Sequence, residues 1–135
     1  MIKYMNLIGI KARKASEYKV TTEVKNKVLN DYAKLIKNEK KFIINQNSKD
    51  INYARKKGLK ENLIKRLHLN ENKLDGIINS ILKIAKLRDP IDSTLEKWKR
   101  PNGLNIKRVS IPIGVIGVIY ESRPNVTSDV ASLCF

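Results

Sequence analysis

The sequence predicts an α/β protein whose first two thirds are helical and whose last third carries the strands. Before Pro90 the apolar residues recur every three to four positions, which is the period of an amphipathic helix. After it, two β-compatible runs flank a Pro-Asn-Gly turn, and a continuous apolar run extends from Val109 to Tyr120. The expected organisation is a helical region over 1–90, a β-hairpin over 91–108, and the first strand, loop and helix start of a further domain over 109–135.

Two helical segments are expected before residue 70. In "TTEVKNKVLNDYAKLIKNEK" the apolar spacing predicts one amphipathic helix, with Thr21 or Thr22 placed to cap its start. The segment "KKFIINQNSKDINYARKKGLKENLIKRLHL" continues helical. Within it, Ser48 and Asp50 predict an interruption or a second cap, and Gly58 predicts a stop before a further short helix.

The clearest helix is predicted in "NENKLDGIINSILKIAKLRDP". Asn70 is placed to cap its start, and Asp89 with Pro90 predicts its end, because the residue before a proline avoids helical backbone. Its apolar side chains form one stripe, made of Leu74, Ile77, Ile78, Ile81, Leu82, Ala85 and Leu87.

The period changes in the last third of the chain. The turn at 101–103 is typical of a hairpin, and it places Trp98 on one arm with Leu104 and Ile106 on the other. The β-branched run from Val109 to Tyr120 predicts a strand buried on both faces of a parallel sheet. Helical spacing then returns, so the chain is expected to end inside a helix that carries Val126, Val130, Leu133 and Cys134.

The charge raises the question of a nucleic-acid partner. Lys and Arg number 28 against 13 Asp and Glu, which gives the 135-residue chain a formal charge of +15. However, 21 of these bases are lysine and 7 are arginine, beside 14 asparagines and 18 isoleucines, and the enriched types share A/T-rich codons. Proteins that bind nucleic acids tend to use arginine and to interleave aromatic residues for stacking. Aromatic residues make up only 6% of this sequence. The charge therefore indicates a solvated surface, and nucleic-acid binding is not expected.

Membrane and metal sites are not expected either. The apolar run that ends at Tyr120 is too short to span a bilayer, and the apolar stretch at the start is too brief for a secretory signal, so a cytoplasmic protein is expected. The single cysteine, Cys134, excludes an internal disulfide and a cysteine-only metal site, and it is expected to pack on a helix face. His68 has no metal-ligand spacing to other residues and is interpreted as structural.

Chemistry is expected in the loop "ESRPNVT", between the predicted strand and the last helix. Glu121, Arg123 and Asn125 place a carboxylate, a guanidinium and an amide at the carboxyl end of a parallel strand, where α/β proteins bind ligands. A helix start offers N–H groups to a phosphate, Arg123 offers a fork of donors, and the Asn125 amide can donate to a developing oxyanion. The alternative from the residues alone is an Asn cap with an Arg–Glu surface pair.

A dinucleotide fingerprint is absent from this region. That motif needs three glycines at the exit of the strand, whereas Gly114 and Gly117 lie before and within the apolar run. They are interpreted as strand glycines that let a neighbouring element approach closely.

The stretch "NGLNIKRVSIPIGVIGVIYESRPNVTSDVASLCF" closely resembles the γ-glutamyl phosphate reductase family of the aldehyde dehydrogenase superfamily, and "KDINYARKKGL" and "LRDP" resemble it as well. The resemblance covers the chain from about residue 10. Two residues depart from the family's pattern: Lys65, where an acidic residue is usual, and Asp92, where a glycine is usual.

The resemblance implies an aldehyde-dehydrogenase-like fold in which the hairpin is an oligomerisation-type extension and the end of the chain starts an incomplete Rossmann-like cofactor domain. It implies NADPH-dependent reduction of L-glutamate 5-phosphate to the semialdehyde and phosphate in proline synthesis, through a cysteine thioester. Asn125 is the nearest match to the superfamily's oxyanion asparagine, in a loop two residues longer. Glu121 and Arg123 match motif positions and are expected to bind phosphate or to orient the loop.

Members of the family are several times longer than this chain, and the resemblance places their nucleophilic cysteine beyond the matched part. Cys134 matches a packing cysteine, so the nucleophile is expected to be absent. We therefore expect an amino-terminal fragment that is inactive alone and acts as a homo-oligomer or with a complementing carboxy-terminal fragment. The alternative is a non-catalytic basic helical fragment that binds nucleic acid or a protein partner.

Overall fold

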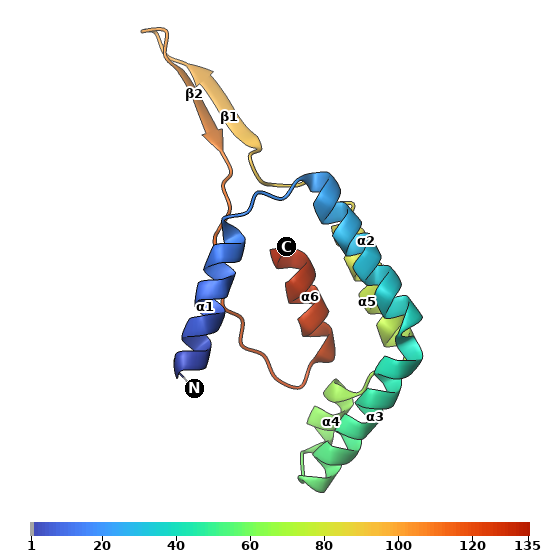
Figure 1. Ribbon diagram of the computed structural model, residues 1–135. Coiled ribbons are helices and arrows are strands. Elements are labelled where there is room, and N and C mark those ends of the chain that lie inside the picture. The colour runs from blue at the N-terminus through green and yellow to red at the C-terminus, as the bar shows by residue number, and fades with distance from the viewer. Residues whose placement is uncertain (1) are drawn as a thin grey trace. The chain divides into compact units, whose positions relative to one another are not determined.

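The computed structural model describes residues 2–135 and divides into two compact units (Figure 1). One unit takes the residues up to Val20 together with Arg88–Gly117, and the other takes Thr21–Leu87 together with Val118–Phe135. The described residues form six α-helices and one two-stranded sheet. This succession of helices, hairpin and final helix confirms the predicted α/β class.

Helices α2 (Thr22–Asn38) and α5 (Glu71–Ile84) form the centre of the larger unit. Both begin at predicted caps, because Thr21 and Asn70 each accept a hydrogen bond from the N–H three residues on, at 3.4 and 2.9 Å. Their facing stripes bury one core cluster, made of Leu29, Ala33, Ile36, Leu69, Leu74, Ile77, Ile78, Ile81 and Ala85. Each large apolar side chain fully buried here contributes about 1.5–3 kcal/mol, and the stripe predicted from the sequence supplies five of the nine residues of this cluster.

The end of α5 differs from the prediction. The helix ends at Ile84, short of the expected stop at Asp89 and Pro90. The N–H groups of Lys86 and Leu87 still bond to the carbonyls of residues 83 and 84, so the chain leaves the helix through tight turns. The turn exposes Leu87, which is 64% accessible and does not join the core.

Helices α3 (Lys40–Lys56) and α4 (Glu61–Leu67) pair in a helical hairpin of the same unit (Figure 1). The interruption predicted at Ser48 and Asp50 is wrong, because α3 is continuous through both. Ser48 Oγ donates to the Ile44 carbonyl at 3.0 Å, which satisfies the hydroxyl inside the helix. The stop predicted at Gly58 is confirmed, since this residue follows α3 with φ +70°.

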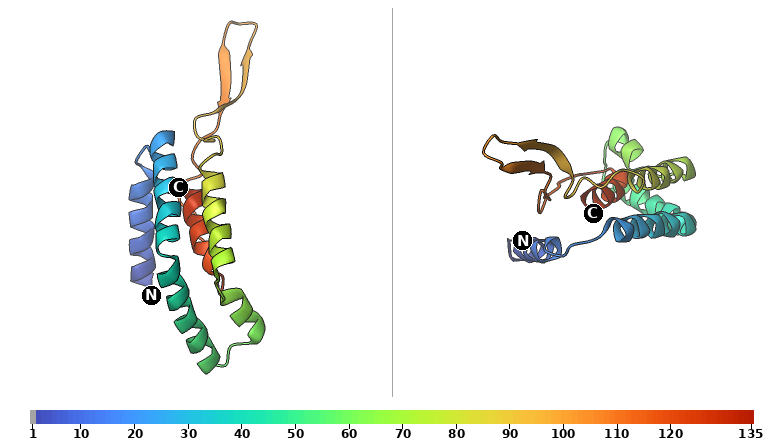
Figure 2. Two further views of the ribbon diagram at one scale, coloured as in Figure 1. Left: turned by 90° about the vertical axis from the view of Figure 1, so that its right-hand side faces the viewer. Right: turned by 90° about the horizontal axis from the view of Figure 1, so that it is seen from above.

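The predicted final helix is confirmed as α6 (Pro124–Cys134), which lies alongside α5 (Figure 2). Its buried residues are Ser128 and Ser132 rather than apolar ones. Cys134 is exposed, so the expectation that it packs on a helix face is wrong.

The smaller unit contains α1 (Ile2–Ser16) and the hairpin of β1 (Thr94–Lys99) with β2 (Asn105–Val109). The hairpin prediction is confirmed: the strands are antiparallel, Trp98 lies opposite Ile106, and Gly103 takes φ +87° in the turn. At the base of the hairpin Asp92 has φ +57°. No element was predicted for the first residues, although the apolar side chains of α1 have helical spacing; these exposed residues are Tyr4, Met5, Leu7, Ile8 and Ile10.

The strand predicted from Val109 to Tyr120 is not formed. In the described structure β2 ends at Val109, and residues 110–121 contain no strand. A strand exists only with a hydrogen-bonded neighbour, and no described segment pairs with the run beyond Ser110. Its apolar side chains are therefore exposed, with Ile113 at 89% and Ile119 at 103%.

Candidate functional site

The predicted site residues lie where the loop that follows residue 119 enters α6. Glu121 and Arg123 are exposed, and Asn125 stands in the first turn of α6, directly after Pro124. The Tyr120 hydroxyl bonds to Thr127 Oγ1 at 2.7 Å, which ties the loop to the first turn of the helix. The structure therefore brings the carboxylate, the guanidinium and the amide to one helix start.

The surface-pair alternative does not describe this loop. Arg123, not Asn125, occupies the cap position of α6, and it makes no side-chain cap bond. Among the described residues no ion pair joins Arg123 to Glu121; ion pairs elsewhere include Lys27–Asp31, Lys40–Asp75 and Arg108–Glu96.

Backbone strain sharpens the turn into α6. Ser122 has φ +55°, in the left-handed region that costs a non-glycine residue about 1–2 kcal/mol. Such residues cluster at binding and catalytic sites because the surrounding structure must hold them. Here the turn lets Pro124, with its fixed φ, start the helix immediately afterwards.

The Asn125 side chain is held by a hydrogen bond at the start of α6. Its Nδ2 donates to Asp129 Oδ2 at 2.9 Å, one turn further along α6. A primary amide has two N–H donors, so this bond fixes the amide plane and leaves a second donor for a ligand. Asp129 also faces α2: burial first, and then the Asp129 charge, raise the pKa of the Tyr32 phenol.

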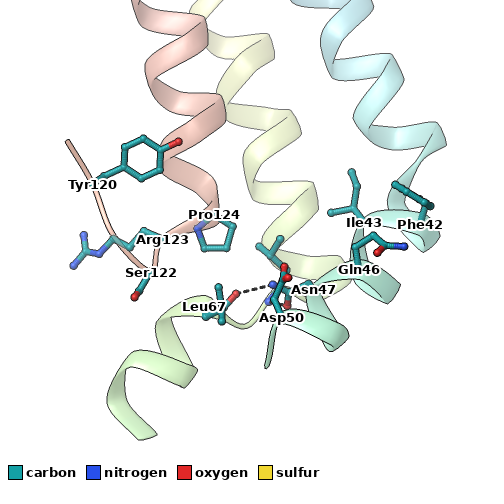
Figure 3. Close-up of a pocket in the computed structure, with 11 residues that line it drawn as sticks. Phe42, Ile43, Gln46, Asn47, Asp50, Leu67, Tyr120, Ser122, Arg123 and Pro124 are labelled. Carbon is teal, nitrogen blue, oxygen red and sulfur yellow. Dashed lines mark hydrogen bonds between the residues drawn. The ribbon is translucent and has the colours of Figure 1, made fainter. Parts of the chain in front are cut away.

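A hollow of about 420 Å³ lies beside the loop, between Tyr120, Ser122 and Pro124 on one side and α3 on the other (Figure 3). The α3 side chains that line it are Phe42, Ile43, Gln46, Asn47 and Asp50. Figure 3 shows the Arg123 guanidinium pointing away from Asn47 and Asp50. Arg123 therefore lines this hollow with its guanidinium directed away from the polar groups of α3.

Asn47 gives this hollow a rigid wall. It is 5% exposed, and its Nδ2 donates to the Leu67 carbonyl at 2.9 Å (Figure 3). Its Oδ1 accepts from the Leu69 N–H at 2.8 Å. One side chain thus satisfies the backbone on both sides of His68. The sequence analysis missed Asn47, because an asparagine within a helix carries no signal for a partner about 20 residues away.

A second hollow, of about 360 Å³, contains Asn125 and Asp129. Facing them are Arg66, His68 and Lys73, from the end of α4, the connection and the first turn of α5. The Lys73 ammonium is held by the carbonyls of His68 at 2.6 Å and Lys65 at 3.4 Å. Sequence spacing does not reveal this group, since its members come from three separate elements.

Gly114 and Gly117 do not form a dinucleotide-binding cradle in the described structure. A dinucleotide cradle depends on glycines whose missing Cβ lets the pyrophosphate approach. A Cβ added to Gly114 or Gly117 would meet no heavy atom within 4 Å, so neither glycine lies in a close approach. Within residues 2–135 no group of three His, Cys, Asp or Glu side chains is placed to hold a metal ion. Nor is any described helix long and apolar enough to cross a membrane.

The chain is similar in sequence to named γ-glutamyl phosphate reductases. The reductase of Nautilia profundicola is 47% identical over 113 residues, which cover 84% of this chain and 28% of the relative. That of Halothermothrix orenii is 44% identical over 132 residues, which cover 94% and 32%. The chain thus spans about a third or less of the length of these relatives. No family model matches it.

Solved structures agree in fold. The γ-glutamyl phosphate reductase of Thermotoga maritima is 40% identical with a TM-score of 0.84, over 91% of this chain and 30% of that one. The enzyme of Saccharomyces cerevisiae is 30% identical with a TM-score of 0.89, over 94% and 33%. These comparisons give no support to the alternative of a basic fragment that binds nucleic acid.

Proposed function

Since the chain belongs to the γ-glutamyl phosphate reductase family, we propose that it provides the amino-terminal part of an enzyme that reduces L-glutamate 5-phosphate to the semialdehyde and phosphate in proline synthesis. The observation that carries this proposal is the "YESRPNVT" loop, which enters α6 with Asn125 exposed in the first helical turn and oriented by Asp129. An oriented amide at the start of a helix suits a developing oxyanion.

In the proposed reaction, the residues of this chain bind and orient the substrate. Asn125 donates to the acyl oxygen as negative charge develops on it, and Arg123, exposed at the same turn, attracts the phosphate. Glu121 orients the loop. The nucleophile and the sites for NADPH are proposed to come from the part of the family's length that this chain does not span.

The proposal includes further features of the whole enzyme. These are NADPH as the reductant, a cytoplasmic location, and assembly as a homo-oligomer or with a complementing carboxy-terminal part. The division into a helical region, an oligomerisation-type hairpin at 91–108 and the start of a cofactor domain at 109–135 also stays a prediction.

A hybrid reductase tests the proposal. In this hybrid, the 135 residues replace the matching amino-terminal part of the Thermotoga maritima enzyme. We expect phosphate-dependent NADPH formation from glutamate semialdehyde, whereas the Thermotoga enzyme without that part, and the 135-residue chain alone, show none. A soluble, folded hybrid without activity would contradict the proposal.

Cys134 supplies the matched control for the nucleophile. A Cys134→Ala hybrid is expected to keep its activity, because this exposed thiol at the end of α6 is not assigned to the reaction. Turnover that disappears in Cys134→Ala would show that the nucleophile belongs to this chain.

A further inference from the structure

The second hollow contains the proposed oxyanion donor, Asn125, together with positively and negatively charged side chains. Asn125 and Asp129 stand on one wall, and Arg66 and Lys73 stand on the other. Its volume of about 360 Å³ lies within the range of small-molecule sites. A ligand whose reacting carbonyl lies at Asn125 would therefore extend into a space that offers one carboxylate and two cations.

We infer that this hollow binds the α-ammonium and α-carboxylate groups of an amino-acid acyl substrate, with Asp129 receiving the ammonium and Arg66 the carboxylate. The inference rests on the proposed function and adds to it a site for the amino-acid head. Two methylene groups separate that head from the reacting acyl carbon of a glutamyl substrate. This reach is comparable with the rise of about 6 Å along α6 over the four positions from Asn125 to Asp129.

Asp129 can serve both neighbours at once. A carboxylate accepts about four hydrogen bonds through its two oxygens, and only Oδ2 is engaged by Asn125 at 2.9 Å. An ammonium bound to the remaining positions would lie beside the amide that contacts the acyl oxygen. The bond between Asn125 and Asp129 would thus couple recognition of the head to the orientation of the oxyanion donor.

The side chains of Lys73 and Arg66 differ in whether they already have hydrogen-bond partners. Lys73 already donates to two backbone carbonyls, which holds its charge at the rim of the hollow. No described hydrogen bond or ion pair involves the exposed Arg66 guanidinium, whose planar fork matches a carboxylate bidentately. Arg66 is therefore the carboxylate partner, and Lys73 supports it electrostatically.

Ligand-detected NMR on the 135-residue chain tests the inference. Saturation transfer to L-glutamate is compared with transfer to glutarate, which lacks the ammonium, and to 4-aminobutyrate, which lacks the α-carboxylate. We expect saturable transfer to L-glutamate, with weaker binding of both analogues by about 10-fold or more, as the loss of a charged hydrogen bond implies.

Two variants assign the partners. Asp129→Asn keeps an acceptor for Asn125 but loses the charge, so it should bind L-glutamate no better than glutarate. Arg66→Gln should remove the preference over 4-aminobutyrate. Lys65→Gln makes the same charge change one residue earlier, outside the hollow, and should leave all three ligands unchanged.

The outcomes separate this inference from the proposed function. Absence of saturable transfer, or equal effects of Lys65→Gln and Arg66→Gln, would overturn the site even if the hybrid reductase is active. Selective binding of L-glutamate with an inactive hybrid would support the site and contradict the reductase function.

Discussion

Asn47 Oδ1 accepts a hydrogen bond from the Leu69 N–H at 2.8 Å, across 22 positions of the chain. The same amide donates to the Leu67 carbonyl, so one buried side chain of α3 fixes the connection between α4 and α5. This connection carries His68 and leads to Lys73, and it therefore sets the wall of both hollows.

Asn47→Ala should lower the free energy of unfolding by about 2–4 kcal/mol, because it leaves a buried N–H and a carbonyl without partners. Asn45→Ala, at an exposed position of the same helix, should change it by less than about 0.5 kcal/mol. Chemical denaturation followed by circular dichroism measures both. Equal effects of the two substitutions would show that the clamp does not stabilise the fold.

Asp92→Gly should stabilise the chain. Asp92 has φ +57°, and removing its side chain relieves about 1–2 kcal/mol of strain, against about 0.5–1 kcal/mol for the added freedom of the unfolded chain. The net expectation is a gain of about 0.5–1 kcal/mol in the hairpin's unit. Asp92→Ala keeps the strain and should not gain stability. A loss of stability in Asp92→Gly would contradict this interpretation.

Tyr32 should make stability fall at alkaline pH. Burial and the Asp129 charge raise its pKa in the folded state, so folding favours the neutral phenol. That contribution is fully present below the pKa of an unfolded tyrosine, about 10, and is lost as pH rises through the higher folded pKa. The difference in unfolding free energy between wild type and Tyr32→Phe should therefore fall between about pH 8 and about pH 11.

Denaturation curves of wild type and Tyr32→Phe at the two pH values measure this change. A Tyr32→Phe difference that is constant with pH would contradict the assigned environment of the phenol.

The exposed apolar run at 111–120 should cause self-association. Its unpaired backbone and β-branched side chains offer a template for strand pairing between molecules. Replacing Ile113 and Ile119 with lysine should shift the chain toward monomer in analytical ultracentrifugation. Leu87→Lys, at a single exposed leucine outside the run, should not. A monodisperse wild-type monomer would contradict the prediction.

The elements that the sequence predicted correctly are those with local causes. The cap of Asn70, the stripe from Leu74 to Ile81 and the turn at Gly103 depend on neighbours within a few positions. The strand after Val109 was not formed, because strand structure depends on a distant partner that composition alone does not supply.

The candidate site divides in the same way. The loop motif predicts Glu121, Arg123 and Asn125 as site residues, since they adjoin one another in the chain, and their role stays a prediction. The clamp of Asn47 and the group around Arg66 and Asp129 could not be predicted, because packing of α3, α4, α5 and α6 brings them together. In the sequence, Asp92 is only a departure from the family's pattern. Its positive φ gives the physical reason why a glycine is usual at this position.

The central claim, that the loop into α6 supplies an oxyanion donor, is tested most directly by the kinetics of an Asn125→Ala hybrid reductase. Loss of the donor should lower kcat by about 100- to 1,000-fold with little change in KM, because the bond strengthens as charge develops on the acyl oxygen. Asn72→Ala, at an exposed asparagine of α5 outside both hollows, should leave both constants unchanged. An Asn125→Ala hybrid with the parent kcat would contradict the account.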